Sequence, residues 1–208
     1  MKIKIHDRLA TLSSSRFLNV LSAEFSRLVF RRRKMLKELM SIYKIDLDVQ
    51  AENRILPTEC TCTSVTTIAG LHLPDPRSLI GHPEFETSTA AGYVVHFLIV
   101  VSQILNTSLR FPVVFQASRS MVINPITTEM LVALEGLGHL NGNIAQLRSD
   151  CGLGTPNKYS TLENLHSLII HLTTEEYAFH YVARINCYFI AATLCDFCTA
   201  FFAFIPCL

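Results

Sequence analysis

The sequence predicts an α+β protein in which a long N-terminal helix leads into a compact domain of short strands and packed helices. Three observations support this class. An apolar repeat with alternating steps of three and four residues runs from Leu18 to Leu39, short alternating segments follow it, and a strongly apolar helical segment lies mid-chain. With 208 residues, 50% of them hydrophobic, the chain is long enough to build one domain around its own core.

The first predicted element is a helix over residues 8–41 with a narrow apolar stripe. Its spacing is that of a coiled-coil seam, with one arginine inside it. A helix cannot bury such a stripe alone, so the pattern favours pairing with a partner helix; a surface helix lying on its own domain is the alternative. The predicted seam residues are Leu18, Leu21, Phe25, Leu28, Arg32, Met35 and Leu39.

The same helix carries a cluster of basic residues. Four of them are candidates for contact with anionic lipid: Arg31, Arg33, Lys34 and Lys37. A solvated helix face explains the cluster equally well. Nucleic acid is disfavoured as a partner, because the net charge is only +1 and no aromatic side chains interleave the basic ones.

The domain that follows is expected to cover residues 42–172. Alternation predicts strands near residues 45–49 and 65–74, and then a buried helix from Glu84 to Leu105. A hairpin of two short strands is expected over residues 111–123. Two more helices are predicted, one from Thr127 to Asp150 and one that starts at the Ser160 cap, three residues before Glu163.

Glycines in the second half of the chain have structural interpretations. Gly136, Gly138 and Gly142 weaken the helix predicted there, which indicates close packing against a neighbour. The segment NGNIAQLRSDCGLGTP resembles a phosphate loop at first sight, but Gly152 is well placed to end a helix. The sequence Thr155-Pro156 blocks further helix, so a joint between two helices is the expected structure.

Residues 173–208 form an apolar tail, expected to be helical. From Ile185 to Leu208 its length suits a membrane span, although Asp196 falls near the middle. A hydrophobic anchor, a buried helix and a translated stretch that is not natural coding sequence are the other interpretations. A protein held on a membrane by this tail is therefore the alternative function.

Motifs for catalysis, cofactors and metals are not found. The sequence contains no Walker loop, dinucleotide fingerprint, HExxH or GxSxG motif. The pairs Cys60/Cys62 and Cys195/Cys198 do not complete a four-ligand zinc site, and seven cysteines without a signal peptide favour a reducing cytosol. We therefore predict a protein that is not an enzyme and binds no cofactor.

Several segments in order resemble one family. They are RRRKMLKELMSIYKI, IAGLHLP, AAGYVVHFLIVVSQIL with LRFPVVFQASRSMV, and NGNIAQLRSDCGLGTP with STLENL. Together these segments resemble the C-terminal half of the UV-radiation-resistance-associated proteins, relatives of the Barkor family. The most specific piece runs from Asn143 to Arg148 and is followed by Gly152 to Pro156.

The resemblance implies a non-catalytic regulatory subunit of class III phosphatidylinositol 3-kinase complexes. Residues 1–41 would be the end of a coiled coil that pairs with a Beclin-like partner. The domain over residues 42–172 would resemble the membrane-associating domain of Beclin, followed by a divergent tail. The implied location is the cytoplasmic surface of endosomes or autophagosomes.

Overall fold

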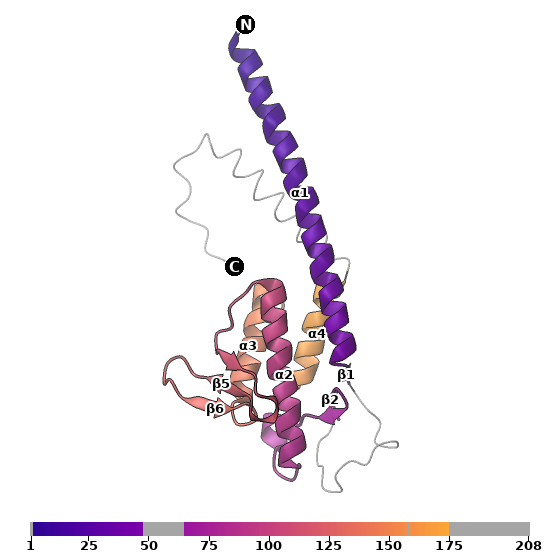
Figure 1. Cartoon of the computed structure of the whole chain (residues 1–208), viewed down its shortest axis with the longest axis vertical. Helices are drawn as coiled ribbons and strands as arrows, with labels where there is room; N and C mark the ends of the chain where they lie inside the picture. The colour runs from indigo at the N-terminus through magenta and orange to yellow at the C-terminus, as the bar shows by residue number, and fades with distance from the viewer. Residues whose placement is uncertain (1, 48–64, 158, 175–208) are drawn as a thin grey trace. The chain divides into compact units, whose positions relative to one another are not determined.

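The computed structural model describes residues 2–47, 65–157 and 159–174, with the side chains of the first helix described from Asn19 on (Figure 1). Residues 32–173 form one compact unit, and residues 1–31 belong to a second unit. The predicted α+β class is confirmed, since helices and small antiparallel sheets alternate along the chain. The predicted tail lies outside the described residues from residue 175 on.

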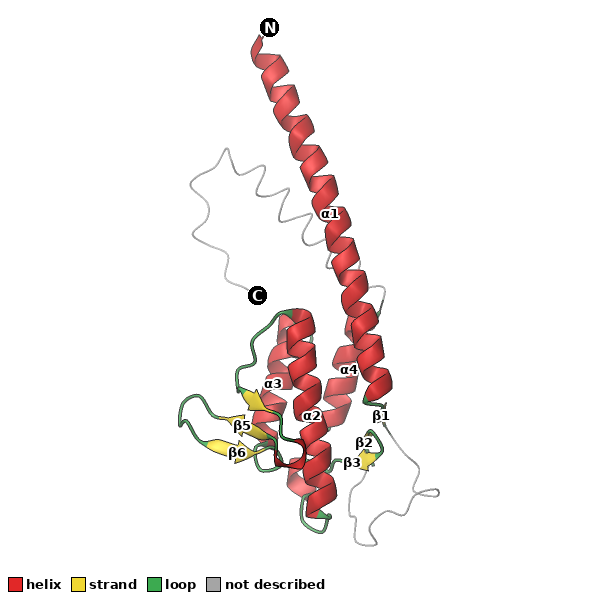
Figure 2. Ribbon diagram, viewed as in Figure 1, coloured by secondary structure: helices red, strands yellow, loops and turns green. Residues whose placement is uncertain are grey.

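The compact unit contains two successive arrangements of a three-stranded sheet followed by a helix (Figure 2). Both sheets are antiparallel, with orders β1-β2-β3 and β4-β5-β6. The first set comprises β1 (Ile45–Asp46), β2 (Thr67–Ile68), β3 (Leu71–His72) and α2 (Glu84–Leu105). The second comprises β4 (Val113–Val114), β5 (Met121–Ile123), β6 (Met130–Val132) and α3 (Leu137–Asp150), and α4 (Thr161–Thr173) follows.

The core lies around α2, which has the predicted bounds and packs against α3 (Figure 1). Within the described residues, α2 is also the one helix with the length and composition of a membrane span. Core helices share those properties, and α2 buries many residues inside the domain. The fully buried ones include Val94, Val95, Phe97, Leu98 and Val101.

The strand predicted over residues 65–74 is a hairpin instead. The chain reverses at Ala69 and Gly70, which have φ of 48° and 85°, and β2 pairs with β3 on either side of them. Two successive positive φ angles are what a two-residue turn between twisted strands requires. The prediction was wrong because the apolar residues on both sides of the turn look like one alternating run.

The helix predicted from Thr127 to Asp150 is also wrong over its first half. Residues 130–132 form β6, which pairs with β5 and completes the second sheet, and α3 begins at Leu137. Thr128 has a φ of 58°, which a helix cannot accommodate. The apolar spacing near Met130 fits a helix as well as a strand, and the pairing with β5 decides between them.

The joint between α3 and α4 is confirmed as predicted. Gly152 has a φ of 78°, its N–H donates to the Ser149 carbonyl, and the N–H of Leu153 donates to the Arg148 carbonyl. This is the Schellman pattern that ends a helix on glycine. At the start of α4, Ser160 and Glu163 exchange hydrogen bonds between side chain and backbone, which is a capping box.

Close packing explains two of the three glycines singled out in the sequence. A Cβ at Gly136 would lie 2.1 Å from Val122 Cγ1, and one at Gly142 would lie 2.7 Å from Phe111 Cε2. The same expectation is wrong for Gly138, where a Cβ would meet no heavy atom within 4 Å. The closest approach of this kind on α2 is at Gly92, beside the short 3-10 helix η3 (Ala117–Arg119).

We expect Gly92→Ala to destabilise the domain. The new Cβ would lie 2.1 Å from the Ala117 carbonyl oxygen, so α2 and the backbone at η3 must separate. Overpacking of this kind costs about 1–3 kcal/mol, which outweighs the gain of roughly 1 kcal/mol in helix propensity. Urea unfolding measures the difference. The matched control is Gly138→Ala, where space is open; equal stability of the two variants would contradict the expectation.

Candidate partner-binding helix

The first helix, α1 (Lys2–Ile42), contributes its last residues, from Arg32 on, to the compact unit. Leu36 is 1% exposed and Leu39 is 5% exposed. Just after the helix, the Tyr43 hydroxyl lies 2.6 Å from His96 Nδ1 on α2, and its ring packs at an edge against Phe97. Burial raises the pKa of Tyr43, so the hydroxyl stays protonated and can donate to the imidazole.

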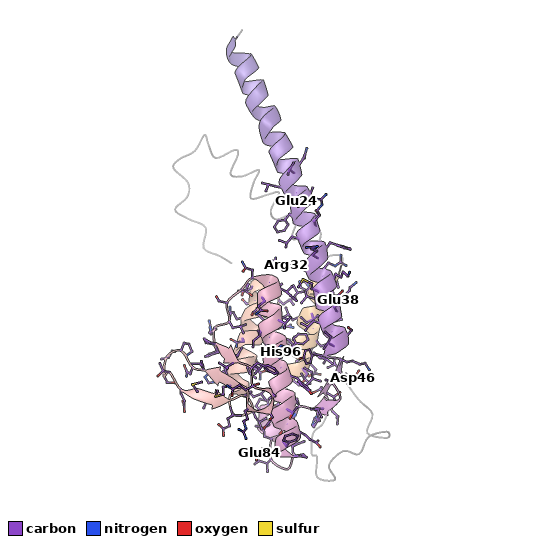
Figure 3. The ribbon with its side chains drawn as sticks, in the orientation of Figure 1. Glu24, Arg32, Glu38, Asp46, Glu84 and His96 are labelled. Carbon is purple, nitrogen blue, oxygen red and sulfur yellow. The ribbon has the colours of Figure 1, made fainter. Side chains whose placement is uncertain are left out.

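Two consecutive arginines, Arg32 (labelled in Figure 3) and Arg33, join the last turns of α1 to the ends of other helices. Arg32 Nη2 donates to the Leu105 carbonyl at 3.2 Å, at the end of α2. Arg33 donates through Nε and Nη2 to the Thr173 carbonyl, at 3.2 and 3.0 Å, at the end of α4. Helix C-termini carry unpaired carbonyls and partial negative charge, so both cations stabilise them. The end of α1 is therefore a structural part of the domain.

A second apolar surface of α1 remains open. We define the outer stripe as Leu21, Leu28, Met35 and Ile42, which follow one another at seven-residue intervals. Leu21 is half-buried, whereas the exposed fractions of the other three are 42%, 49% and 68%. Exposed apolar residues that repeat every seven positions lie along one line of a helix, which suits a second helix packed beside it.

The residues of the predicted seam therefore fall on two different sides of α1. Leu21, Leu28 and Met35 lie on the outer stripe, whereas Arg32 and Leu39 contact the chain's own domain. Phe25 is half-buried, and the side chain of Leu18 lies outside the described part of α1. The sequence interpretation missed Ile42, although continuing the repeat by one more step of seven would have found it. Partner binding by these residues stays a prediction.

The residues predicted to contact lipid are placed differently from one another. Arg31, Lys34 and Lys37 are exposed, and Lys34 Nζ lies 3.8 Å from Glu38 Oε1. Arg33 is bound to the Thr173 carbonyl and is therefore less available. Contact with anionic lipid stays a prediction, now carried by the three exposed cations.

Helix α3 holds the loop between α2 and β4 through two amide side chains. Asn143 accepts from the Phe111 N–H and donates to its carbonyl, both at 2.8 Å. One turn further on, Gln146 accepts from the Arg110 N–H at 2.7 Å and donates to the Ser108 carbonyl at 2.8 Å. Each amide satisfies one donor and one acceptor of the loop backbone, so both act as specific clamps. The sequence interpretation did not assign these roles.

Arg148 holds the joint between α3 and α4. It is 4% exposed, and its Nε and Nη2 donate to the Gly154 carbonyl at 3.1 and 2.6 Å. Its Nη1 donates to the Asn164 carbonyl on α4 at 2.9 Å. Burial lowers the pKa of the guanidinium, but arginine remains protonated at neutral pH. A buried cation thus fixes the shape of the motif that ends at Pro156.

The described residues offer little for catalysis or metal binding. No group of three His, Cys, Asp or Glu side chains able to hold a metal ion occurs among them. The cysteines considered and rejected as zinc ligands, Cys60, Cys62, Cys195 and Cys198, lie outside the described residues. One pocket of about 200 Å³ lies between α3, η2 (Pro76–Ser78) and the joint before α4. It is smaller than a typical ligand site, and its polar lining of Asp75, Thr155, Tyr159 and three asparagines lacks a cysteine or histidine.

The fold and the exposed outer stripe define an α+β domain with a helix suited to protein interaction. The chain is 31% identical over 162 residues to the UV radiation resistance-associated protein of Mus musculus, across 70% of this chain. It therefore belongs to that family, as the sequence motifs indicated. The chain spans about a fifth of the length of this relative (21%). No family model matches the chain.

Proposed function

We propose that the chain is a non-catalytic adaptor subunit of a class III phosphatidylinositol 3-kinase complex that pairs with a Beclin-like coiled-coil partner. The observation that carries this proposal is the outer stripe of α1, whose apolar side chains are exposed at heptad spacing beside a helix end fixed in the domain. Family membership supports a role in autophagy or endocytic trafficking. The chain would supply binding, and the chemistry would belong to its partners.

We further propose that the compact unit is a domain of the Beclin membrane-associating type. Support comes from its two successive sets of a three-stranded sheet and a helix. The proposed location is the cytoplasmic surface of endosome or autophagosome membranes. Lys34 and Lys37 are exposed, lie away from the outer stripe and would contact anionic lipid there.

Co-expression with Beclin tests the central proposal. The tagged chain is expected to retain Beclin through size-exclusion chromatography as one complex. Circular dichroism of the chain alone must first establish that it is folded. A folded chain that elutes without Beclin would contradict the proposed pairing.

A further inference from the structure

The two flanks of the outer stripe differ in chemistry. One residue after each of the last two stripe positions come Leu36, which is 1% exposed, and Tyr43, whose hydroxyl lies within hydrogen-bond distance of His96 Nδ1. Three residues after the first three stripe positions come Glu24, Arg31 and Glu38, which are all exposed. We name these three the charged flank. Figure 3 labels Glu24 and Glu38 on the same helix. The chain's own domain therefore covers the flank that contains Leu36 and Tyr43. We call it the closed flank, and only the charged flank can face a partner.

The charged flank is available for contacts with another chain. Glu24 Oε1 lies 2.6 Å from Arg27 Nη1, and Glu38 Oε1 lies 3.8 Å from Lys34 Nζ. The side chains of both ion pairs are highly exposed. Such pairs are weak and leave the carboxylates able to interact with further cations. Arg31 makes no ion pair with any residue that the structure describes.

The order of charges argues against a second copy of this chain as the partner. In an antiparallel self-pair the charged flanks would face each other, with Glu24 opposite Glu38 and Arg31 opposite Arg31. Like charges at facing positions are destabilising. In a parallel pair the charged flank of one helix faces the other flank of its neighbour, where Leu36 is already buried. Neither orientation brings opposite charges together.

We propose that the outer stripe takes one helix of a different protein, whose flanking positions carry a basic, an acidic and a basic residue at seven-residue intervals. The charge order of the flank reads the same from either end, so this complement is required whether the partner runs parallel or antiparallel. Because the domain already covers the closed flank, only one partner helix can pack beside the outer stripe. The inference refines the proposed function by naming the chemistry that selects the partner.

Two synthetic helical peptides test this charge rule on the full chain. They share the same leucine repeat and differ only in three flanking residues, Lys-Glu-Lys in one and Glu-Lys-Glu in the other. Fluorescence anisotropy is expected to show about five- to tenfold tighter binding of the Lys-Glu-Lys peptide, since each exposed pair contributes modestly. The preference is expected to shrink at high salt.

The charge-reversed chain Glu24→Lys/Arg31→Glu/Glu38→Lys is the matched variant. All three sites are exposed, so it is expected to fold normally and to prefer the Glu-Lys-Glu peptide. Equal binding of both peptides, no binding of either, or an unchanged preference in this variant would overturn the charge rule. Binding of the Beclin coiled coil is measured in the same assay. If Beclin does not bind, the proposed function is contradicted, but the two peptides still decide the charge rule.

Discussion

Replacing Met35 by aspartate is expected to weaken binding to the Beclin coiled coil by at least roughly 100-fold, which corresponds to about 2.7 kcal/mol. Met35 lies in the middle of the outer stripe and is 49% exposed in the unpaired chain. Pairing would bury the new carboxylate between two apolar helices without a partner, and an unpaired buried charge is costly. Isothermal titration calorimetry with the purified coiled coil measures the change.

The control for this prediction adds the same charge to the same helix on another face. Phe30 is 66% exposed and lies five positions before Met35, about 140° away around the helix. Phe30→Asp should therefore leave binding nearly unchanged. Both variants should unfold within about 0.5–1 kcal/mol of wild type, because both side chains are already exposed. Similar losses of binding in the two variants would show that the stripe is not the contact surface.

Helices with strong local signals could be predicted from the sequence. The bounds of α2 match because its apolar run is long and Glu84 and Glu86 occupy its first turn, where the helix dipole favours acids. The start of α4 matches because its capping box uses residues three positions apart. These features depend on neighbours in the chain, so they can be recognised before the fold is known.

Features that depend on distant residues could not be predicted in the same way. Residues 130–132 are a strand because β5 lies beside them, and no local pattern expresses that pairing. The division of the seam has the same origin. Arg32 is bound by the last carbonyl of α2, which is 73 positions away. Sequence spacing therefore placed an apolar line on α1 but could not tell which of its residues the domain would cover.

Replacing Arg148 by methionine is expected to destabilise the compact unit by about 2–4 kcal/mol. Methionine fills a similar path through the core but donates no hydrogen bond. The carbonyls of Gly154 and Asn164 would lose their guanidinium donors inside the protein, where water cannot easily replace them. Urea unfolding gives the free energy. Hydrogen exchange is expected to accelerate over residues 152–157, because Arg148 holds this joint against α4.

The matched control is Arg110→Met, because it removes the same charge from an exposed position and leaves the hydrogen bond from the Arg110 backbone N–H to Gln146 in place. Its effect on stability should stay within about 0.5 kcal/mol. Arg148→Lys separates charge from geometry: a single ammonium keeps the charge but cannot reproduce the fork that spans both carbonyls. Its stability should fall between wild type and Arg148→Met. If Arg148→Met proves as stable as Arg110→Met, the buried fork does not hold the joint, and helix packing alone must account for it.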